Sequence, residues 1–333
     1  MPSYISVSGY GWSGSSACID ILKEFEGFGV FNGEFRIAKD PYGLIDLEES
    51  LVHNWDFVRH DVAIKDFLNY CKVLGRDTGL FSRSGKDFSN KLDVDFMSKS
   101  KTYVYKITDM VYLGDTSVHR YNIPAYKNFF MKIRSKIGES NAEFMYLARP
   151  DKSNFIKETR NYINSLFGDY IDSNKINTLV LDQAVPPTNI SNSAQFFEKI
   201  KVIIIDRDPR DIYSNLVRNK VLIGADLSNS DSADKYSRWH KILRSNLQGE
   251  GSNKECYKDV LRLNFEDLVC NYEQSVSKII DFIGVGIVHK NKYNYFNPES
   301  IRSKSNVGLW KEYKNQYVMD RIGDELAEYC YNY

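Results

Sequence analysis

Two runs of apolar residues, each ending in an aspartate, most constrain the fold of this chain. Residues 177–182 read Asn-Thr-Leu-Val-Leu-Asp, and residues 201–206 read Lys-Val-Ile-Ile-Ile-Asp. The second run is apolar at successive positions, which is typical of a strand buried on both faces of a parallel sheet. Residues 259–264 form a third run, and segments with helical spacing alternate with these strands. The pattern predicts an α/β fold with three layers around a central parallel sheet.

The N-terminus adds a further strand, a loop rich in glycine and serine, and a helix. Residues 4–7 are strand-like, residues 8–16 read Ser-Gly-Tyr-Gly-Trp-Ser-Gly-Ser-Ser, and residues 17–25 have helical spacing. Such a loop suits an anion, because glycines let the backbone curl, its N–H groups point inward, and the helix adds positive partial charge. Gly14 fits the glycine spacing of a Walker loop, but Ser15 stands where that loop has lysine. The loop therefore predicts a phosphate-like ligand without ATP hydrolysis.

A second anion site is predicted directly after the strand at residues 201–206. Residues 206–215 read Asp-Arg-Asp-Pro-Arg-Asp-Ile-Tyr-Ser-Asn, with two arginines, a proline suited to a helix start, and a hydroxyl one turn later. Ligands of parallel α/β sheets bind beyond the carboxyl ends of the strands. Two anion sites at neighbouring strand ends predict a ligand with phosphates at both of its ends.

With these motifs the chain resembles the sulfotransferases that use 3′-phosphoadenosine 5′-phosphosulfate (PAPS), most of all the bacterial carbohydrate sulfotransferases. Residues 13–16 match the Ser-Gly-[Ser/Thr]-[Ser/Thr] loop that binds the 5′-phosphosulfate, and residues 207–211 with Ser214 match the Arg-x-Pro-x-Asp…Ser element for the 3′-phosphate. Residues 264–268 are similar to the family's Tyr-Glu-Asp-Leu segment, and residues 304–311 to its Arg-Lys-Gly-x-x-Gly-x-Trp-Lys closing loop. The four motifs occur in the family's order and span nearly the whole chain.

The resemblance implies a P-loop-like fold in a single sulfotransferase domain over residues 1–333. It is loosest over residues 40–175, where helical patterns dominate. We expect this segment to be a largely helical insertion that binds the acceptor.

The resemblance also implies the residues that bind PAPS and its product PAP. The first loop would bind the 5′-phosphosulfate; Arg207, Lys304, and either Ser214 or Asn215 would bind the 3′-phosphate, and an aromatic ring would stack on adenine. The full predicted set is Gly11, Trp12, Ser13, Gly14, Ser15, Ser16, Arg207, Ser214, Asn215, Phe265, Lys304, Gly308, Trp310 and Lys311.

Three positions depart from the family's pattern. Trp12 replaces the basic residue that opens the first loop, so another cation must act on the leaving phosphate. Ser214 lies one residue earlier than the family's serine, and Asn215 occupies the expected place on the helix. Ser305 stands where the closing loop has glycine. The candidates for the missing cation are Lys311, Arg36 and Lys39.

For the base that takes the acceptor's proton, the family uses a histidine or a glutamate. Glu34 follows the first helix at the interval of the glutamate in glycan sulfotransferases, and aromatic residues flank it. Desolvation by such neighbours favours proton uptake by a carboxylate, which suits a base. His60 and Asp182 are the alternatives, and Asp182 ends a predicted strand.

Composition excludes several classes of protein. Lys plus Arg and Asp plus Glu are both 44, so the overall charge favours neither nucleic acid nor an anionic surface. Five scattered cysteines without metal-ligand spacing indicate reduced thiols, and neither a secretion signal nor a membrane span is apparent. We therefore expect a cytoplasmic protein without a metal, and peripheral contact with a membrane is left open.

The implied function is transfer of a sulfuryl group from PAPS to a hydroxyl of a glycan or lipid-linked saccharide, which gives PAP and a sulfate ester. Sulfation of a lipid, phenol or alcohol is one alternative. A P-loop kinase of small molecules would explain two phosphate sites but needs the lysine that the first loop lacks. A PAP-binding module without catalysis is the non-enzymatic alternative, and Trp12 is compatible with it. The sequence does not predict the oligomeric state.

Overall fold

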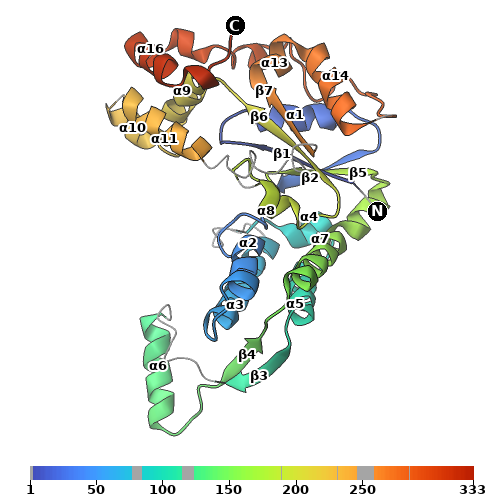
Figure 1. Ribbon diagram of the computed structural model, residues 1–333, viewed down its shortest axis with the longest axis vertical. Coiled ribbons are helices and arrows are strands. Elements are labelled where there is room, and N and C mark those ends of the chain that lie inside the picture. Colours follow the sequence, from blue (N-terminus) through green and yellow to red (C-terminus); the bar gives the residue numbers. More distant parts are fainter. Residues whose placement is uncertain are drawn as a thin grey trace. The chain divides into compact units, whose positions relative to one another are not determined.

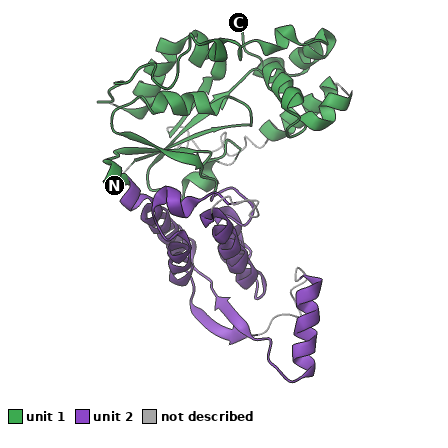
Figure 2. Cartoon of the chain, turned by 180° about the vertical axis from the view of Figure 1, so that it is seen from behind, with its two compact units in different colours: residues 1–36, 171–333 green, residues 37–170 purple. Residues whose placement is uncertain are grey.

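The computed structural model describes residues 3–76, 85–114, 124–188, 190–230, 232–245, 259–284 and 286–333. The chain divides into two compact units (Figure 2). Unit 1 comprises residues 1–36 and 171–333, and unit 2 comprises residues 37–170. Each unit has its own core and is described by itself.

Unit 1 is built on a five-stranded parallel sheet in the order β2-β5-β1-β6-β7 (Figure 1). Its strands are β1 (Ser3–Gly9), β2 (Phe28–Glu34), β5 (Thr178–Asp182), β6 (Ile200–Asp206) and β7 (Val260–Asn264). The inner strands β1, β5 and β6 are almost wholly buried, because apolar residues point to both faces. The predicted α/β fold with a central parallel sheet is confirmed.

Helices flank this sheet and form two groups (Figure 1). The helices α1 (Ser15–Leu22), α13 (Phe265–Cys270) and α14 (Tyr272–Ile283) share a core cluster with strand residues such as Val7 and Ile205. A second cluster joins α9 (Pro209–Asn219), α10 (Gly224–Ser230), α11 (Ala233–Ser245) and α16 (Gln316–Glu325). The remaining short elements of unit 1 are α8 (Ile190–Ala194), α15 (Ile301–Lys304), η4 (Leu309–Glu312) and η5 (Ala327–Tyr329).

Unit 2 is mostly helical, with one antiparallel hairpin. Its helices are α2 (Leu44–Glu48), η1 (Glu49–His53), α3 (Arg59–Gly75), α4 (Phe88–Leu92), α5 (Phe96–Lys106) and α6 (Ala125–Lys136), and most of α7 (Lys152–Asn174). The hairpin pairs β3 (Met110–Gly114) with β4 (Glu143–Leu147). Tyr103 stacks on Tyr162 at 4.7 Å in the core, and the Tyr162 hydroxyl lies 2.7 Å from that of Ser100. The boundaries of unit 2 resemble those of the expected insertion, whose role in acceptor binding stays a prediction.

The structure differs from the sequence pattern in three places. Residues 224–234 have a loop-like composition, yet α10 forms there, because Leu227 is fully buried and Gly224 lets the helix approach the Leu216 carbonyl closely. The first helix ends at Leu22 rather than at residue 25. The edge strand β2 carries no apolar run and was missed. Residues 248–254, whose polar composition also predicts a loop, lie outside the described residues.

Candidate functional site

The loop between β1 and α1 curls because three of its residues adopt left-handed backbone conformations. Their φ angles are +88° at Gly11, +57° at Trp12 and +84° at Gly14. A Cβ atom on Gly14 would lie 2.4 Å from Cδ2 of Phe265, so this position needs glycine for space as well as for φ. The N-cap residue of α1 is Gly14, which has no side chain to cap the helix. The N–H of Ala17 donates to the Gly14 carbonyl at 3.0 Å, so the N–H groups that we assign to an anion are those of Ser15 and Ser16.

A cavity of about 380 Å³ lies beside this helix N-terminus. It adjoins the carboxyl ends of β1, β6 and β7, where ligands of parallel sheets bind. Its lining residues come from the first loop and α1, from Arg207 before α9, from α9 itself, from the start of α13 and from residues 295–306. They are Trp12, Gly14, Ser15, Ser16, Ala17, Asp20, Arg207, Asn215, Phe265, Tyr295, Phe296, Asn297, Ser300, Arg302, Ser303 and Asn306.

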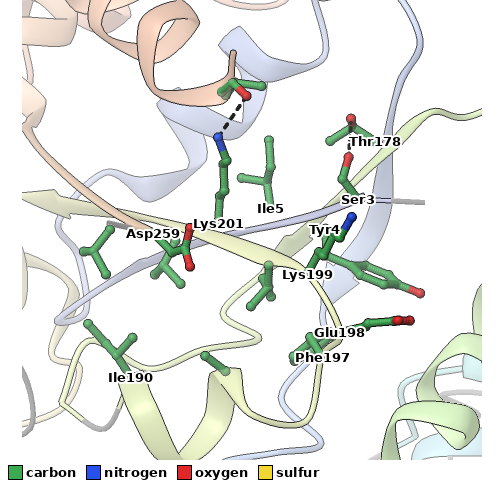
Figure 3. A pocket seen from close by; sticks show the side chains of 15 residues that line it. Ser3, Tyr4, Ile5, Thr178, Ile190, Phe197, Glu198, Lys199, Lys201 and Asp259 are labelled. Atoms are coloured by element: carbon green, nitrogen blue, oxygen red, sulfur yellow. Dashed lines mark hydrogen bonds between the residues drawn. The ribbon is translucent and has the colours of Figure 1, made fainter. Parts of the chain in front are cut away.

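A second cavity of unit 1, of about 420 Å³, lies at the amino ends of the strands (Figure 3). Ile5 and Phe197 give it a largely apolar wall. The Lys201 ammonium donates to the carbonyl oxygens of Phe282 and Ile283 at 2.6 and 2.9 Å. None of the residues predicted to bind an anion lines this cavity. We therefore take the cavity at the carboxyl edge as the candidate site.

Arg207 connects the first loop with the C-terminal loop. Its Nη1 donates to the Trp12 carbonyl at 3.1 Å, and its Nη2 donates to the Asn306 carbonyl at 2.5 Å. The hydrogen-bond network orients the amide oxygen of Asn215 toward Arg207, where it accepts from Nη1 at 2.8 Å. The guanidinium lies over the Phe265 ring at 4.8 Å and is only 4% exposed, and its Nε has no hydrogen-bond partner among the described residues.

Burial lowers the pKa of Arg207, although nearby Asp211 and Glu266 oppose the shift. A guanidinium that is desolvated and retains an unused N–H gains from an anionic ligand. Arg207 therefore both positions the two loops and lines the cavity.

Asp211 positions the C-terminal loop from α9. Its carboxylate accepts from the backbone N–H groups of Gly308 at 2.8 Å and Trp310 at 3.0 Å. Burial raises the pKa of Asp211, and these bonds together with Arg207 oppose the shift. The Trp310 ring packs against the Arg210 guanidinium, 3.9 Å from its centre, so Trp310 braces α9 rather than the cavity.

Glu266 links the starts of α13 and α9. Its Oε1 accepts from the backbone N–H of Asp208 at 2.9 Å, and its side chain is fully buried. Burial raises the pKa of Glu266 to about 7. The Asp208 carboxylate in turn accepts from Arg210 Nε at 2.9 Å. These contacts fix the two helix starts that frame the cavity.

The structure brings half of the predicted PAPS-binding residues together around the cavity. Those that line it are Trp12, Gly14, Ser15, Ser16, Arg207, Asn215 and Phe265. Those outside the lining are Gly11, Ser13, Ser214, Lys304, Gly308, Trp310 and Lys311. Of the two alternatives on α9, Asn215 faces the cavity.

Three of the residues outside the lining have other partners. The hydroxyl of Ser214 donates to the Arg210 carbonyl at 2.9 Å. Lys304 donates to the Glu299 carboxylate at 2.5 Å. The Lys311 ammonium lies 4.3 Å from the centre of the Tyr333 ring.

Residues 295–306 form one wall of the cavity, and sequence reasoning predicted only residues 304–306 of it, as part of the closing loop, and missed residues 295–303. Buried Glu24 accepts from the backbone N–H groups of Tyr295 at 2.9 Å and Phe296 at 3.0 Å, and from His289 at 2.7 Å. Burial acts to raise the pKa of Glu24, but these bonds outweigh it and lower the pKa below its ordinary value. Arg302, exposed at this wall, lies two residues before the closing-loop motif at residues 304–311, and this position in the sequence is the one local signal for it.

Two of the three candidate bases are neighbours in the sheet. Glu34 and Asp182 are register partners at the carboxyl ends of β2 and β5. The Glu34 side chain is exposed, whereas the flanking Phe31 and Phe35 are buried, so these rings do not desolvate the carboxylate as the sequence suggested. His60 belongs to unit 2, where it is 1% exposed and its Nδ1 lies 2.7 Å from the Asp56 carbonyl oxygen.

The described part of the chain holds no group of three or more His, Cys, Asp or Glu side chains arranged for a metal ion. It also has no helix with the length and apolar character needed to span a membrane.

No protein-family model matches the chain, and no curated protein matches it. Among solved structures it is similar to a sulfotransferase domain from the curacin biosynthetic pathway, with 13% identity, 98% of each chain covered and a TM-score of 0.43. It is also similar to retinol dehydratase in complex with androsterone and the inactive cofactor PAP. There the identity is 15%, the match covers 99% of this chain and 82% of the other, and the TM-score is 0.33. Similarity of this degree does not bear on the site, which rests on its own residues.

Proposed function

We propose that this chain transfers a sulfuryl group from PAPS to an acceptor hydroxyl and releases PAP. One observation carries the proposal: the N-terminus of α1 and the side chains of Arg207, Asn215 and Arg302 line the same cavity. Two separate groups of anion-binding donors around one cavity suit a nucleotide that bears both a 5′ and a 3′ phosphate.

The residues of the cavity fit such a ligand. Gly14 lets the first loop pack directly against the Phe265 ring, where any Cβ atom would clash, and Arg207 retains an N–H without a hydrogen-bond partner among the described residues. The α1 N-terminus with Ser15 and Ser16 would bind the 5′ end, and Arg207 with Asn215 would bind the 3′-phosphate. When bound, PAPS supplies the activated sulfuryl group.

The side chains of unit 1 would then bind PAPS, orient its 5′ end and take the proton from the acceptor hydroxyl. The partial positive charge at the α1 N-terminus would stabilise negative charge that develops at the 5′ end. Because Trp12 supplies no cation, we assign that role to Arg302, an exposed guanidinium in the cavity wall. Glu34 is the proposed base, since its exposed carboxylate ends β2, and Asp182 on the adjacent strand is the alternative.

The acceptor that we propose is a carbohydrate hydroxyl. This assignment is supported by the motif similarity to carbohydrate sulfotransferases. Binding of the acceptor by unit 2 and a cytoplasmic location belong to the same proposal.

The test is transfer of label from PAPS that carries ³⁵S in its sulfuryl group. The protein is incubated with saccharide, lipid-linked saccharide, phenol and alcohol acceptors, and labelled product and PAP are both measured. We expect label on a saccharide, with turnover reduced in Arg302→Gln and retained in the control Arg321→Gln, an arginine of α16 outside the cavity lining. Tight PAP binding without turnover on any acceptor would instead favour a PAP-binding module without catalysis.

A further inference from the structure

Helix α6 of unit 2 presents a continuous apolar stripe to solvent. Tyr126, Phe129, Phe130, Ile133 and Ile137 follow a spacing of three and four residues, so they lie on one helix face. Their exposed fractions run from 40% to 69%, and no residue of α6 is buried. An exposed patch of large apolar side chains of this kind marks an interaction surface.

The hairpin that carries α6 continues this apolar character. The helix lies in the connection between β3 and β4 (Figure 1). Leu113 pairs with Phe144, next to the final pair of the hairpin, Gly114 with Glu143. This is the end of the hairpin from which the chain continues toward α6. Leu113 and Phe144 are 67% and 66% exposed. Exposed apolar side chains therefore occur both on α6 and on the end of the β3–β4 hairpin to which α6 is connected.

Cations border the stripe on both sides. At ~100° per residue, Lys132 and Lys136 fall on one edge of the apolar arc, and Lys127 and Arg134 fall on the other. The sequence of α6 contains no carboxylate. Arg134 pairs with the exposed Glu139 at 3.1 Å, a contact that water and salt weaken.

We propose that α6, together with the end of the β3–β4 hairpin, binds the surface of an anionic phospholipid membrane. A basic amphipathic helix lies in the plane of such an interface, with its apolar face among the acyl chains and its lysines extended to the headgroups. The two rows of cations match the negative surface of the bilayer. This surface function is separate from sulfuryl transfer and does not rest on it.

The charge pattern favours a membrane over a second copy of the chain. A symmetric pair formed through this face would bring the same patch against itself, and so would place the lysines of one α6 near those of the other. Like charges at close range oppose that pairing.

Vesicle flotation tests the proposal with the whole protein. Vesicles of phosphatidylcholine alone are compared with vesicles that also contain phosphatidylglycerol, at low and high salt. We expect flotation with the anionic vesicles, little with the neutral ones, and loss at high salt. Phe129→Ser with Phe130→Ser, and separately Lys132→Glu with Lys136→Glu, should each weaken binding at least ~10-fold.

Two control variants change exposed residues of unit 1 in the same ways. Tyr317→Ser removes an aromatic ring that is 71% exposed, and Lys314→Glu reverses an exposed charge. Both should float like the unaltered protein, and circular dichroism checks that all variants are folded. Absence of flotation with anionic vesicles, or unchanged flotation of the α6 variants, overturns the proposal. The proposal is also overturned, in favour of a second copy of the chain, if the protein does not bind vesicles but self-associates and the Phe129→Ser, Phe130→Ser variant does not.

Discussion

Replacement of Gly14 by alanine tests the geometry of the first loop. The backbone there has a φ of +84°, which costs an alanine about 1–2 kcal/mol. The new Cβ would also lie 2.4 Å from Cδ2 of Phe265, and displacement of that ring adds about 1–3 kcal/mol. We expect a total loss of roughly 2–5 kcal/mol in the free energy of unfolding.

Gly286→Ala is the matched control within unit 1. Its φ is +90°, and apart from its chain neighbours no atom of the described residues lies within 4 Å of the added Cβ, so we expect the backbone cost alone. Urea unfolding followed by tryptophan fluorescence gives both free energies. Because Arg207 lies over the Phe265 ring, Gly14→Ala should also weaken PAP binding by at least ~10-fold in calorimetry, while Gly286→Ala should not. Equal destabilisation by the two alanines would refute the steric argument.

Three further predictions concern charged groups of unit 1. Arg207→Lys should lose the hydrogen bonds to the two loops and the contact with the Phe265 ring. We expect the free energy of unfolding in urea to fall by about 2–4 kcal/mol and PAP to bind much more weakly. Unchanged stability together with unchanged PAP binding would contradict the role of Arg207. Glu34→Gln should lower turnover at least ~100-fold in a PAP-release assay while its affinity for PAP is unchanged. A normal rate in Glu34→Gln, together with a slow rate in Asp182→Asn, would identify Asp182 as the base. The pKa of Glu266 is raised from 4.5 to about 7, so the folded state binds the proton more tightly, and the stability that this provides is full below about pH 4.5 and lost as the pH rises through about 7. In Glu266→Gln, the free energy of unfolding should therefore vary by about 3 kcal/mol less between about pH 5 and 8 than in the unaltered protein. Urea unfolding at several pH values measures this, and an equal variation in the two proteins would contradict the assignment.

The sequence predicted those parts of unit 1 that depend on local apolar patterns. Strands β1, β5, β6 and β7 carry apolar runs, and the parallel sheet followed from them. The edge strand β2 contains Gly29, Asn32 and Gly33, which have low strand propensity, so its pairing depends on β5 and not on its own residues.

The same distinction applies to the site. The first loop and Arg207 were found because glycine, serine and arginine follow buried strands directly. Residues 295–303 of the wall were missed because Glu24, far away in the sequence, fixes Tyr295 and Phe296 through their backbone N–H groups. A backbone contact of this kind leaves no pattern in the side chains that it positions.

Calorimetric titration with PAP, ADP and ATP tests most directly whether the cavity is a site for a nucleotide with 3′ and 5′ phosphates. We predict that PAP binds at least ~10-fold more tightly than ADP or ATP, and that Arg207→Lys removes this preference while the control Arg321→Gln retains it. Binding of ATP as tight as or tighter than that of PAP would contradict the account and favour a kinase.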